Sequence, residues 1–103
     1  QAIAQSDKPV MLDFWASWCV ACKEFEEITF KDTQVINKLQ NFTLLKADVT
    51  ANNADDKALQ KMFSIVGPPG IIFWDKDKNE VKSSKIVGYK NPKEFLDIVN
   101  KNF

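Results

Sequence analysis

A six-residue run, Val10–Trp15, is apolar except for Asp13. A run of this kind is typical of a strand whose two faces are both covered, as in a parallel sheet. Such a strand needs helices on both sides of its sheet. The run therefore predicts an α/β fold, and it leaves Asp13 as a residue that the strand pattern does not explain.

Helical and strand patterns alternate along the rest of the chain. Helices are predicted over residues 1–7, from the cysteines toward Phe30, from a cap at Asp32 or Thr33 through Leu39, after a cap at Asn53, and after Asn91-Pro92. Further strands are predicted over Phe42–Val49, Ile71–Asp75 and Val81–Val87, the last two as an antiparallel pair. The order α-β-α-β-α-β-β-α predicts a central mixed sheet with helices on both faces.

The chain has 103 residues and a net charge of zero. This length predicts one domain over residues 1–103, which we expect to be monomeric. The sequence has no basic stripe, so it does not favour binding to nucleic acid. Its longest apolar runs, such as Ile71–Trp74, are too short to cross a bilayer, and we expect no membrane insertion of the domain itself. The start lacks an initiator Met and a signal peptide, and we expect a domain taken from a larger protein.

The chain contains two cysteines, Cys19 and Cys22, and no histidine. A structural zinc site needs about four ligands, typically Cys and His, so a site within one chain is disfavoured, whereas a zinc ion that bridges a dimer stays open. A structural disulfide across so short a loop would restrain the unfolded chain little. Two inert buried thiols would not explain why the pair lies between a strand and a helix.

The position of the pair favours thiol–disulfide exchange. Cys19 falls near the N-terminus of a predicted helix, where unpaired N–H groups and the helix dipole favour a thiolate. Only a thiolate attacks a disulfide, and Cys22 lies one helical turn deeper, within reach of Cys19. We therefore expect Cys19 to be the nucleophile and Cys22 to be the resolving thiol.

Longer stretches carry a resemblance to a known family. "VMLDFWASWCVACK" (residues 10–23) resembles the thioredoxin superfamily, and Gly67-Pro68-Pro69-Gly70 resembles the cis-proline loop of that family. "KPVMLDFWASWCVACKEFEEITF" and "ADVTANNADDKALQKMFSIVGPPGIIFW" are similar to the C-terminal periplasmic domain of bacterial thiol:disulfide interchange proteins. The resemblance implies a thioredoxin-like three-layer fold and a redox-active Cys19–Cys22 disulfide, with no cofactor and no metal.

The resemblance also implies a role as a relay. The domain would take electrons from a transmembrane domain of the same protein and pass them to its N-terminal periplasmic domain, on the periplasmic side of the bacterial inner membrane. That partner would in turn reduce disulfide isomerases and cytochrome-maturation proteins. Two alternatives stay open: a free-standing thioredoxin-like disulfide reductase, and a redox-inactive binding module whose cysteines are structural or metal-bound.

Two acidic residues accompany the cysteines. Asp13 is expected to be a buried carboxyl with a raised pKa that takes and returns the proton of Cys22, the alternative being a structural acid. Glu26 follows Cys22 by four residues and shares its helix face, so spacing alone leaves it between a solvated and a functional acid, and the resemblance favours function. Negative charge from both acids would raise the thiol pKa of Cys19 above that of a strongly oxidising oxidase.

Three residues are expected to bind the partner. Trp18 directly precedes Cys19 and is expected on the docking surface rather than in the core. By its resemblance, Pro69 would be a cis proline that holds the partner's backbone beside Cys19. Pro68 departs from the family pattern because it has no N–H to donate, so one carbonyl bond remains where two bonds are usual. Gly70 stands where Thr is common and is expected to add flexibility.

Overall fold

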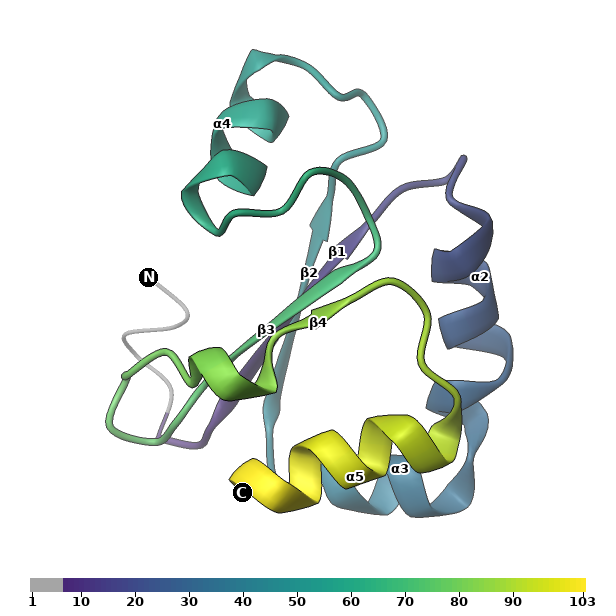
Figure 1. Ribbon diagram of the computed structural model, residues 1–103, viewed down its shortest axis with the longest axis vertical. Helices are drawn as coiled ribbons and strands as arrows, with labels where there is room; N and C mark the ends of the chain where they lie inside the picture. Colours follow the sequence, from purple (N-terminus) through teal and green to yellow (C-terminus); the bar gives the residue numbers. More distant parts are fainter. Residues whose placement is uncertain (1–6) are drawn as a thin grey trace.

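The computed structural model describes residues 7–103, which contain a four-stranded sheet. The strands are β1 (Val10–Trp15), β2 (Thr43–Asp48), β3 (Gly70–Trp74) and β4 (Ile86–Val87), in the order β2-β1-β3-β4. β1 runs parallel to β2 and antiparallel to β3, which is itself antiparallel to β4 (Figure 1). The predicted mixed sheet is therefore confirmed. The helix predicted before Lys8 falls outside the described part of the chain.

Four α-helices flank this sheet in the described residues. They are α2 (Val20–Glu27), α3 (Thr33–Leu39), α4 (Ala54–Met62) and α5 (Pro92–Asn102). Asp32, and not Thr33, caps α3, because its carboxylate accepts two N–H groups of the first turn. Asn53 and Asn91 begin α4 and α5 with capping boxes, so each of these helix starts was readable from the sequence.

The helix that follows the cysteines is shorter than predicted. α2 ends at Glu27, and a 3₁₀ turn, η1 (Thr29–Lys31), replaces the last turn predicted to reach Phe30. Thr29 is fully buried, and its hydroxyl donates to the carbonyl of Lys90 at 2.7 Å. The chain thus leaves the α-helix where this buried hydroxyl finds a distant partner.

The strand predicted over Val81–Val87 is wrong in its first half. A 3₁₀ turn, η2 (Lys82–Ser84), occupies that half, and Ile86–Val87 alone pair with β3, as β4. Ser84 is fully buried, and its hydroxyl donates to the carbonyl of Val81 at 2.6 Å. Short hydroxyl side chains that bond the backbone locally favour a turn over a strand, which accounts for the difference.

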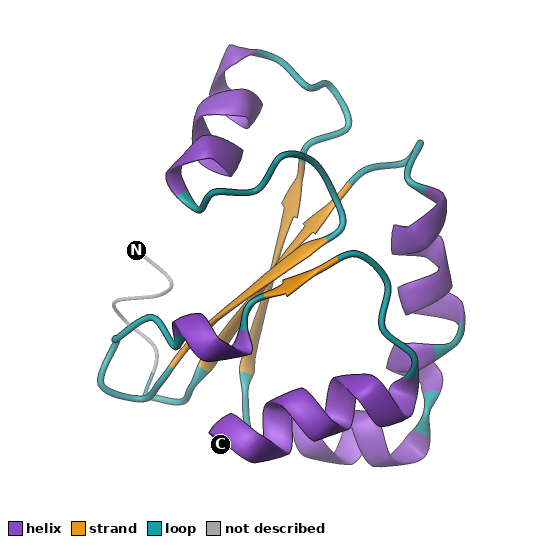
Figure 2. Cartoon of the chain, in the orientation of Figure 1, coloured by secondary structure: helices purple, strands orange, loops and turns teal. Residues whose placement is uncertain are grey.

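Helices lie on both faces of the sheet, as predicted (Figure 2). Side chains along β1 alternate between two hydrophobic clusters, one for each face. The cysteine-side cluster, with the partly buried Leu59 and Phe63 of the α4 region, consists of Val10, Leu12, Phe14, Ala16, Cys19, Cys22, Val49, Ile65, Ile72 and Trp74. The aromatic cluster, beneath α2, α3 and α5, consists of Met11, Phe25, Val35, Leu39, Phe42, Ile71, Phe73, Ile86, Phe95 and Val99.

Candidate active site

β1 delivers the chain to the two cysteines. The strand ends at Trp15, and Cys19 takes the N-cap position of α2 with extended backbone angles (φ −93°, ψ 106°). Its sulfur accepts the backbone N–H of Cys22 at 3.1 Å. The two sulfurs form a disulfide, with Cα atoms 5.3 Å apart. The prediction that Cys19 lies at the helix N-terminus is confirmed, and the pair is in its oxidised state.

The two sulfurs differ in their surroundings. Cys22 is 2% exposed, and its Sγ lies 3.8 Å from the carbonyl oxygen of Phe14 on β1. Cys19 is 6% exposed, but the residues on either side of it, Trp18 and Val20, are both exposed. The molecular surface therefore opens at Cys19, whereas Cys22 faces the sheet.

A residue that the sequence analysis missed, Thr50, holds Trp18 in place. The indole N–H of Trp18 donates to the Thr50 carbonyl at 2.9 Å, although the side chain is 55% exposed. The Thr50 hydroxyl accepts the N–H of Ser17 at 2.9 Å and donates to the carboxylate of Asp48. Asp48 also accepts the N–H of Thr50, two residues on, which is the pattern of an Asx turn and the signal by which this loop could have been found.

The proline loop leaves the sheet beside the cysteine loop. Antiparallel pairing puts Phe14 opposite Gly70, so the segments that follow β1 and precede β3 lie at the same end of the sheet (Figure 1). The Pro68–Pro69 peptide bond is cis, in agreement with the resemblance of this loop to that of the thioredoxin superfamily. The carbonyl of Pro69 accepts the N–H of Gly88 at 3.2 Å. Within residues 7–103 the Pro68 carbonyl has no hydrogen-bond partner, so it is available to another chain.

Gly70 lies close to the side chain of Ile65. The residue is buried in β3, where it pairs with Val87. A Cβ atom at this position would lie 2.6 Å from Cδ1 of Ile65 and 3.1 Å from its Cγ2. A side chain at position 70 would therefore require the side chain of Ile65 to shift, whereas the added flexibility expected of Gly70 stays a prediction.

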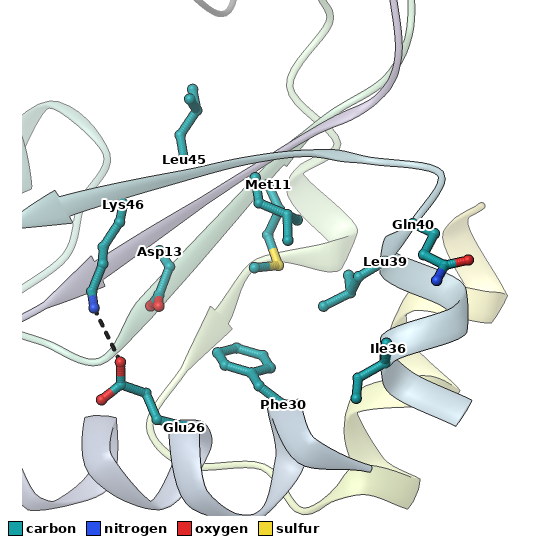
Figure 3. Close-up of a pocket in the computed structure, with 10 residues that line it drawn as sticks. Met11, Asp13, Glu26, Phe30, Ile36, Leu39, Gln40, Leu45 and Lys46 are labelled. Atoms are coloured by element: carbon teal, nitrogen blue, oxygen red, sulfur yellow. Dashed lines mark hydrogen bonds and ion pairs between the residues drawn. The ribbon is translucent and has the colours of Figure 1, made fainter. Parts of the chain in front are cut away.

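Asp13 extends from β1 toward the space between the sheet and α2 (Figure 3). Burial raises the pKa of Asp13 to about 7, the nearby Lys46 ammonium lowers it, and the Glu26 carboxylate raises it. Lys46 is the residue opposite Asp13 on β2. The predicted direction of the pKa shift is confirmed, and proton transfer with Cys22 stays a prediction.

Glu26 is held by two neighbours. Its carboxylate lies 3.0 Å from Nζ of Lys46 (Figure 3). The same carboxylate accepts the indole N–H of Trp15 at 3.2 Å. The same Nζ lies 4.2 Å from the centre of the Trp15 ring. The structure thus brings Asp13, Glu26 and Lys46 together. Sequence reasoning missed Lys46, because the register of β2 against β1 cannot be read from either strand alone.

This arrangement supplies thiol–disulfide exchange and an acid that titrates near neutral pH. The sulfurs of Cys19 and Cys22 form and break one disulfide, and Asp13, with a pKa of about 7, can take up or release a proton near neutral pH. Among the described residues, no group of three or more Cys, Asp or Glu side chains is arranged to hold a metal ion. None of the described helices is long and apolar enough to cross a membrane.

Comparison with known proteins gives this site a family. Residues 1–102 match the thioredoxin-like domain family. The chain belongs to this family. The resemblance inferred from the stretch around Cys19 is therefore confirmed, and so is the fold class that it implied.

Relatives that match most of this chain are named thiol:disulfide interchange proteins. The thiol:disulfide interchange protein DsbD of Pectobacterium atrosepticum is 49% identical over 94 residues, or 91% of this chain, and that of Ralstonia nicotianae is 48% identical over 96 residues, or 93%. The chain spans 16% of the length of each of these relatives. Together with the Cys19–Cys22 disulfide, these relatives show that the domain is a thiol–disulfide oxidoreductase.

Solved structures agree with both the fold and the narrower relationship. The C-terminal domain of Neisseria meningitidis DsbD, in its oxidised form, is 32% identical and superposes with a TM-score of 0.78, over 97% of this chain and 84% of that one. A thioredoxin from Thermus thermophilus superposes with a TM-score of 0.79, over 97% of this chain and 78% of that one, at 22% identity. The second similarity establishes the fold alone.

Proposed function

We propose that the domain relays electrons within a DsbD-like membrane protein, on the periplasmic side of the bacterial inner membrane. A dithiol of a transmembrane domain reduces it, and it then reduces an N-terminal periplasmic domain. The observation that carries this proposal is the Cys19–Cys22 disulfide at the start of α2, in a chain 49% identical to a DsbD over 91% of its length. The chain spans 16% of the length of that relative, so the transmembrane domain and the N-terminal domain are proposed as partners.

Electron transfer proceeds by two exchanges of sulfur partners. The Cys19 thiolate attacks the partner's disulfide, a Cys19–partner bond forms, and one partner thiolate leaves. Cys22 then loses its proton and attacks the sulfur of Cys19, the mixed disulfide breaks, and the second partner thiolate leaves. The partner gains two electrons, and the Cys19–Cys22 disulfide is restored.

Asp13 takes the proton of Cys22 in the second exchange. Its pKa of about 7 lets it accept a proton near neutral pH and release it afterwards. The thiol of Cys22 lies 3.8 Å from the carbonyl oxygen of Phe14, the residue that follows Asp13 on β1. Glu26 acts on Asp13 rather than on the sulfur, because its negative charge raises the pKa of Asp13 while its own carboxylate is paired with Lys46.

Partner docking uses the open surface around Cys19. The exposed side chains of Trp18 and Val20 flank the sulfur, and the tether to Thr50 keeps the indole of Trp18 in one position. A partner strand beside the proline loop donates one hydrogen bond from its N–H to the Pro68 carbonyl, and it receives none in return because Pro68 has no N–H. Affinity therefore depends more on side-chain contact than on backbone pairing.

A glutathione redox titration followed by tryptophan fluorescence tests the direction of electron flow. A two-electron transition between about −270 and −200 mV is expected for an electron donor. A transition near about −120 mV is that of an oxidase and would overturn the relay. Zinc in the purified reduced protein, with no transition, would revive the metal-bound alternative.

Trapping in the full-length protein tests the partners. With Cys22→Ser in place, the resolving step is lost, and a mixed disulfide from Cys19 to the N-terminal periplasmic domain should accumulate on a non-reducing gel. The matched control, Cys19→Ser, should trap nothing. A Cys22→Ser protein that forms adducts with unrelated proteins but not with this domain contradicts the relay and favours a free-standing reductase.

A further inference from the structure

A groove of about 390 Å³ opens beside the redox site, between the β2 edge of the sheet and the helices α2 and α3 (Figure 3). Its volume lies within the range of about 300 to 1,000 Å³ that is usual for small-molecule sites. The groove shares Asp13 and Glu26 with the exchange proposed above, but its lining includes neither cysteine, and its apolar body has no part in that exchange.

The body of the groove is apolar. Met11 from β1, Phe30 from η1 and Leu39 from α3 line it (Figure 3). Two further apolar residues of the lining are partly solvated, since Leu44 is 53% exposed and Ile36 is 44% exposed. Apolar surface thus runs from the solvent to the interior and is covered by no other described element.

The polar end of the groove contains two carboxyl groups in different states. Glu26 is satisfied, because it pairs with Lys46 and accepts the indole N–H of Trp15. Asp13 receives no hydrogen bond from any described residue. No buried side-chain oxygen in the described part of the chain lacks a partner, so the carboxyl of Asp13 must be open to the groove. Once ionised, Asp13 adds a second negative charge to this end of the groove, where the one cation, Lys46, is already paired with Glu26.

We propose that this groove binds a small amphipathic cation, a primary alkylammonium. Its hydrocarbon body lies on Met11, Phe30 and Leu39, and its ammonium group pairs with the carboxylate of Asp13. The apolar lining favours a hydrocarbon chain. Asp13 accepts no hydrogen bond from a described residue, so its carboxylate favours a positively charged hydrogen-bond donor at one end of that chain. A neutral alcohol of the same length matches the first feature only.

Binding should depend on pH through Asp13. The charged groups that face Asp13 are Lys46 from β2 and Glu26 from α2, while β3 places Ile71 opposite it and η1 presents Phe30. Asp13 is ionised above a pKa of about 7, and an alkylammonium stays charged up to a pKa near about 10.4, as in lysine. Affinity should therefore fall at least about tenfold between about pH 8 and about pH 5.5.

The inference also predicts an effect on the relay, although binding itself does not rest on that function. A bound cation stabilises the ionised form of Asp13 and lowers its pKa, so the pH at which exchange accelerates should move downward. If binding is found and exchange does not respond, the groove is a ligand site without a role in the relay. If the relay fails its own test, the binding experiment keeps its meaning.

The experiment is a titration of the uniformly ¹⁵N-labelled oxidised protein with n-hexylammonium, read from backbone amide shifts. We expect saturable shifts at the lining residues and affinity at least about tenfold weaker for 1-hexanol and for Asp13→Asn. Leu44→Ser should weaken binding at least about threefold, because it removes apolar lining. The matched control Val87→Ser removes a similar apolar side chain, 56% exposed, from the opposite edge of the sheet and should leave binding unchanged.

Equal affinity for hexylammonium and hexanol, or for the wild type and Asp13→Asn, would overturn the proposal. Shifts that gather outside the groove, on α4 for example, would also overturn it. If Asp13→Asn fails to fold, the pH series on the wild-type protein decides instead: affinity that stays constant across the titration of Asp13 rules out the ammonium–carboxylate pair.

Discussion

The two faces of the sheet carry cores of different character. The aromatic cluster is built from rings: Phe25 stacks on Phe30 at 5.2 Å between centroids, and Phe95 meets both edge-on or nearly so. The cysteine-side cluster contains the two cysteines together with smaller residues such as Ala16 and Val49 and the rings of Phe14 and Trp74. One helix, α2, joins both, with Cys22 in the first core and Phe25 in the second.

This difference separates chemistry from stability within a single turn of helix. The rings of Phe30, Tyr89 and Phe95 pack against Phe25 and so fix the C-terminal half of α2 in place. The sulfurs need room, because Cys19 must reach a partner and then return to Cys22. Phe25, three residues after Cys22, can therefore be optimised for packing without contact to the reactive sulfurs.

Cys22→Ser should have the largest effect, because it should abolish the chemistry of the cysteine-side cluster and leave the fold intact. Attack by Cys22 is intramolecular, and its loss should prolong the mixed disulfide with a model substrate by roughly a thousandfold or more. The free energy of unfolding of the reduced variant should stay within about 1 kcal/mol of wild type. Mass spectrometry of quenched samples follows the adduct. A short-lived adduct would mean that Cys22 is not the resolving thiol.

Phe25→Ala should weaken the aromatic cluster and lower the stability of the fold. Removal of a fully buried ring should lower the free energy of unfolding by about 3–5 kcal/mol, measured by urea denaturation. The nearby Ile28→Ala, at a side chain that is 50% exposed, should change it by no more than about 0.5 kcal/mol. Exchange rates of the folded Phe25→Ala protein should stay near wild type. A large loss of rate without unfolding would show that the two clusters are coupled.

Asp13→Asn should change how the free energy of unfolding depends on pH. Because the folded pKa of Asp13 is raised from 3.8 to about 7, the folded state binds the extra proton between these values. The free energy of unfolding of the wild type should therefore fall relative to Asp13→Asn as pH rises from about 4 to about 7, by at most about 1.4 kcal/mol per pH unit. Above about pH 7 the difference should be constant, with the variant the more stable.

The same variant should slow the exchange. Loss of the proton acceptor should reduce the rate of the second exchange by about 10²-fold or more at pH above 7, and the inflection near pH 7 should disappear from the rate profile. Paired denaturation curves and stopped-flow exchange measure the two effects. Parallel stability curves for wild type and variant would contradict the raised pKa of Asp13.

Two substitutions should shift the pKa of Asp13 in opposite directions, and these shifts should be the smallest of the expected effects. Glu26→Gln removes a negative charge and should lower the pKa of Asp13, whereas Lys46→Met removes a positive charge and should raise it. The two side chains are 42% and 48% exposed, so each shift should stay below about one pH unit. Carbon NMR of the Asp13 carboxyl measures the pKa.

The exposed pair of Lys93 and Asp97 on α5 provides the control for this experiment. Lys93→Met removes a similar ion pair far along the chain from Asp13 and should leave the Asp13 pKa unchanged. Shifts of the same sign in Glu26→Gln and Lys46→Met would mean that the substitutions act through structure rather than through charge.

Local patterns predicted the fold well wherever they decide the structure. The caps at Asn53 and Asn91 fix two helix starts, and the run Val10–Trp15 fixes the central strand. Errors fall where a distant partner overrides the local pattern. Thr29 bonds to Lys90, 61 residues away, and its helix ends early for that reason.

The candidate site could be predicted only in part for the same reason. Cys19, Cys22 and Asp13 stand out within one short stretch of sequence, and the resemblance supplied Pro69. Lys46 and Thr50 come from a different strand and its following loop, and their contacts depend on the register of two strands. The steric limit at Gly70 depends on Ile65, whose side chain no pattern within β3 could place.

The close approach of Ile65 to Gly70 couples these two positions. A Cβ atom at position 70 would meet Cδ1 of Ile65 at 2.6 Å, so a change to threonine requires the Ile65 side chain to shift. Removal of that side chain by Ile65→Ala should lower the cost of the same change. The two substitutions are therefore expected to be non-additive, so the effect of a residue at position 70 in a relative depends on which residue that relative carries at position 65.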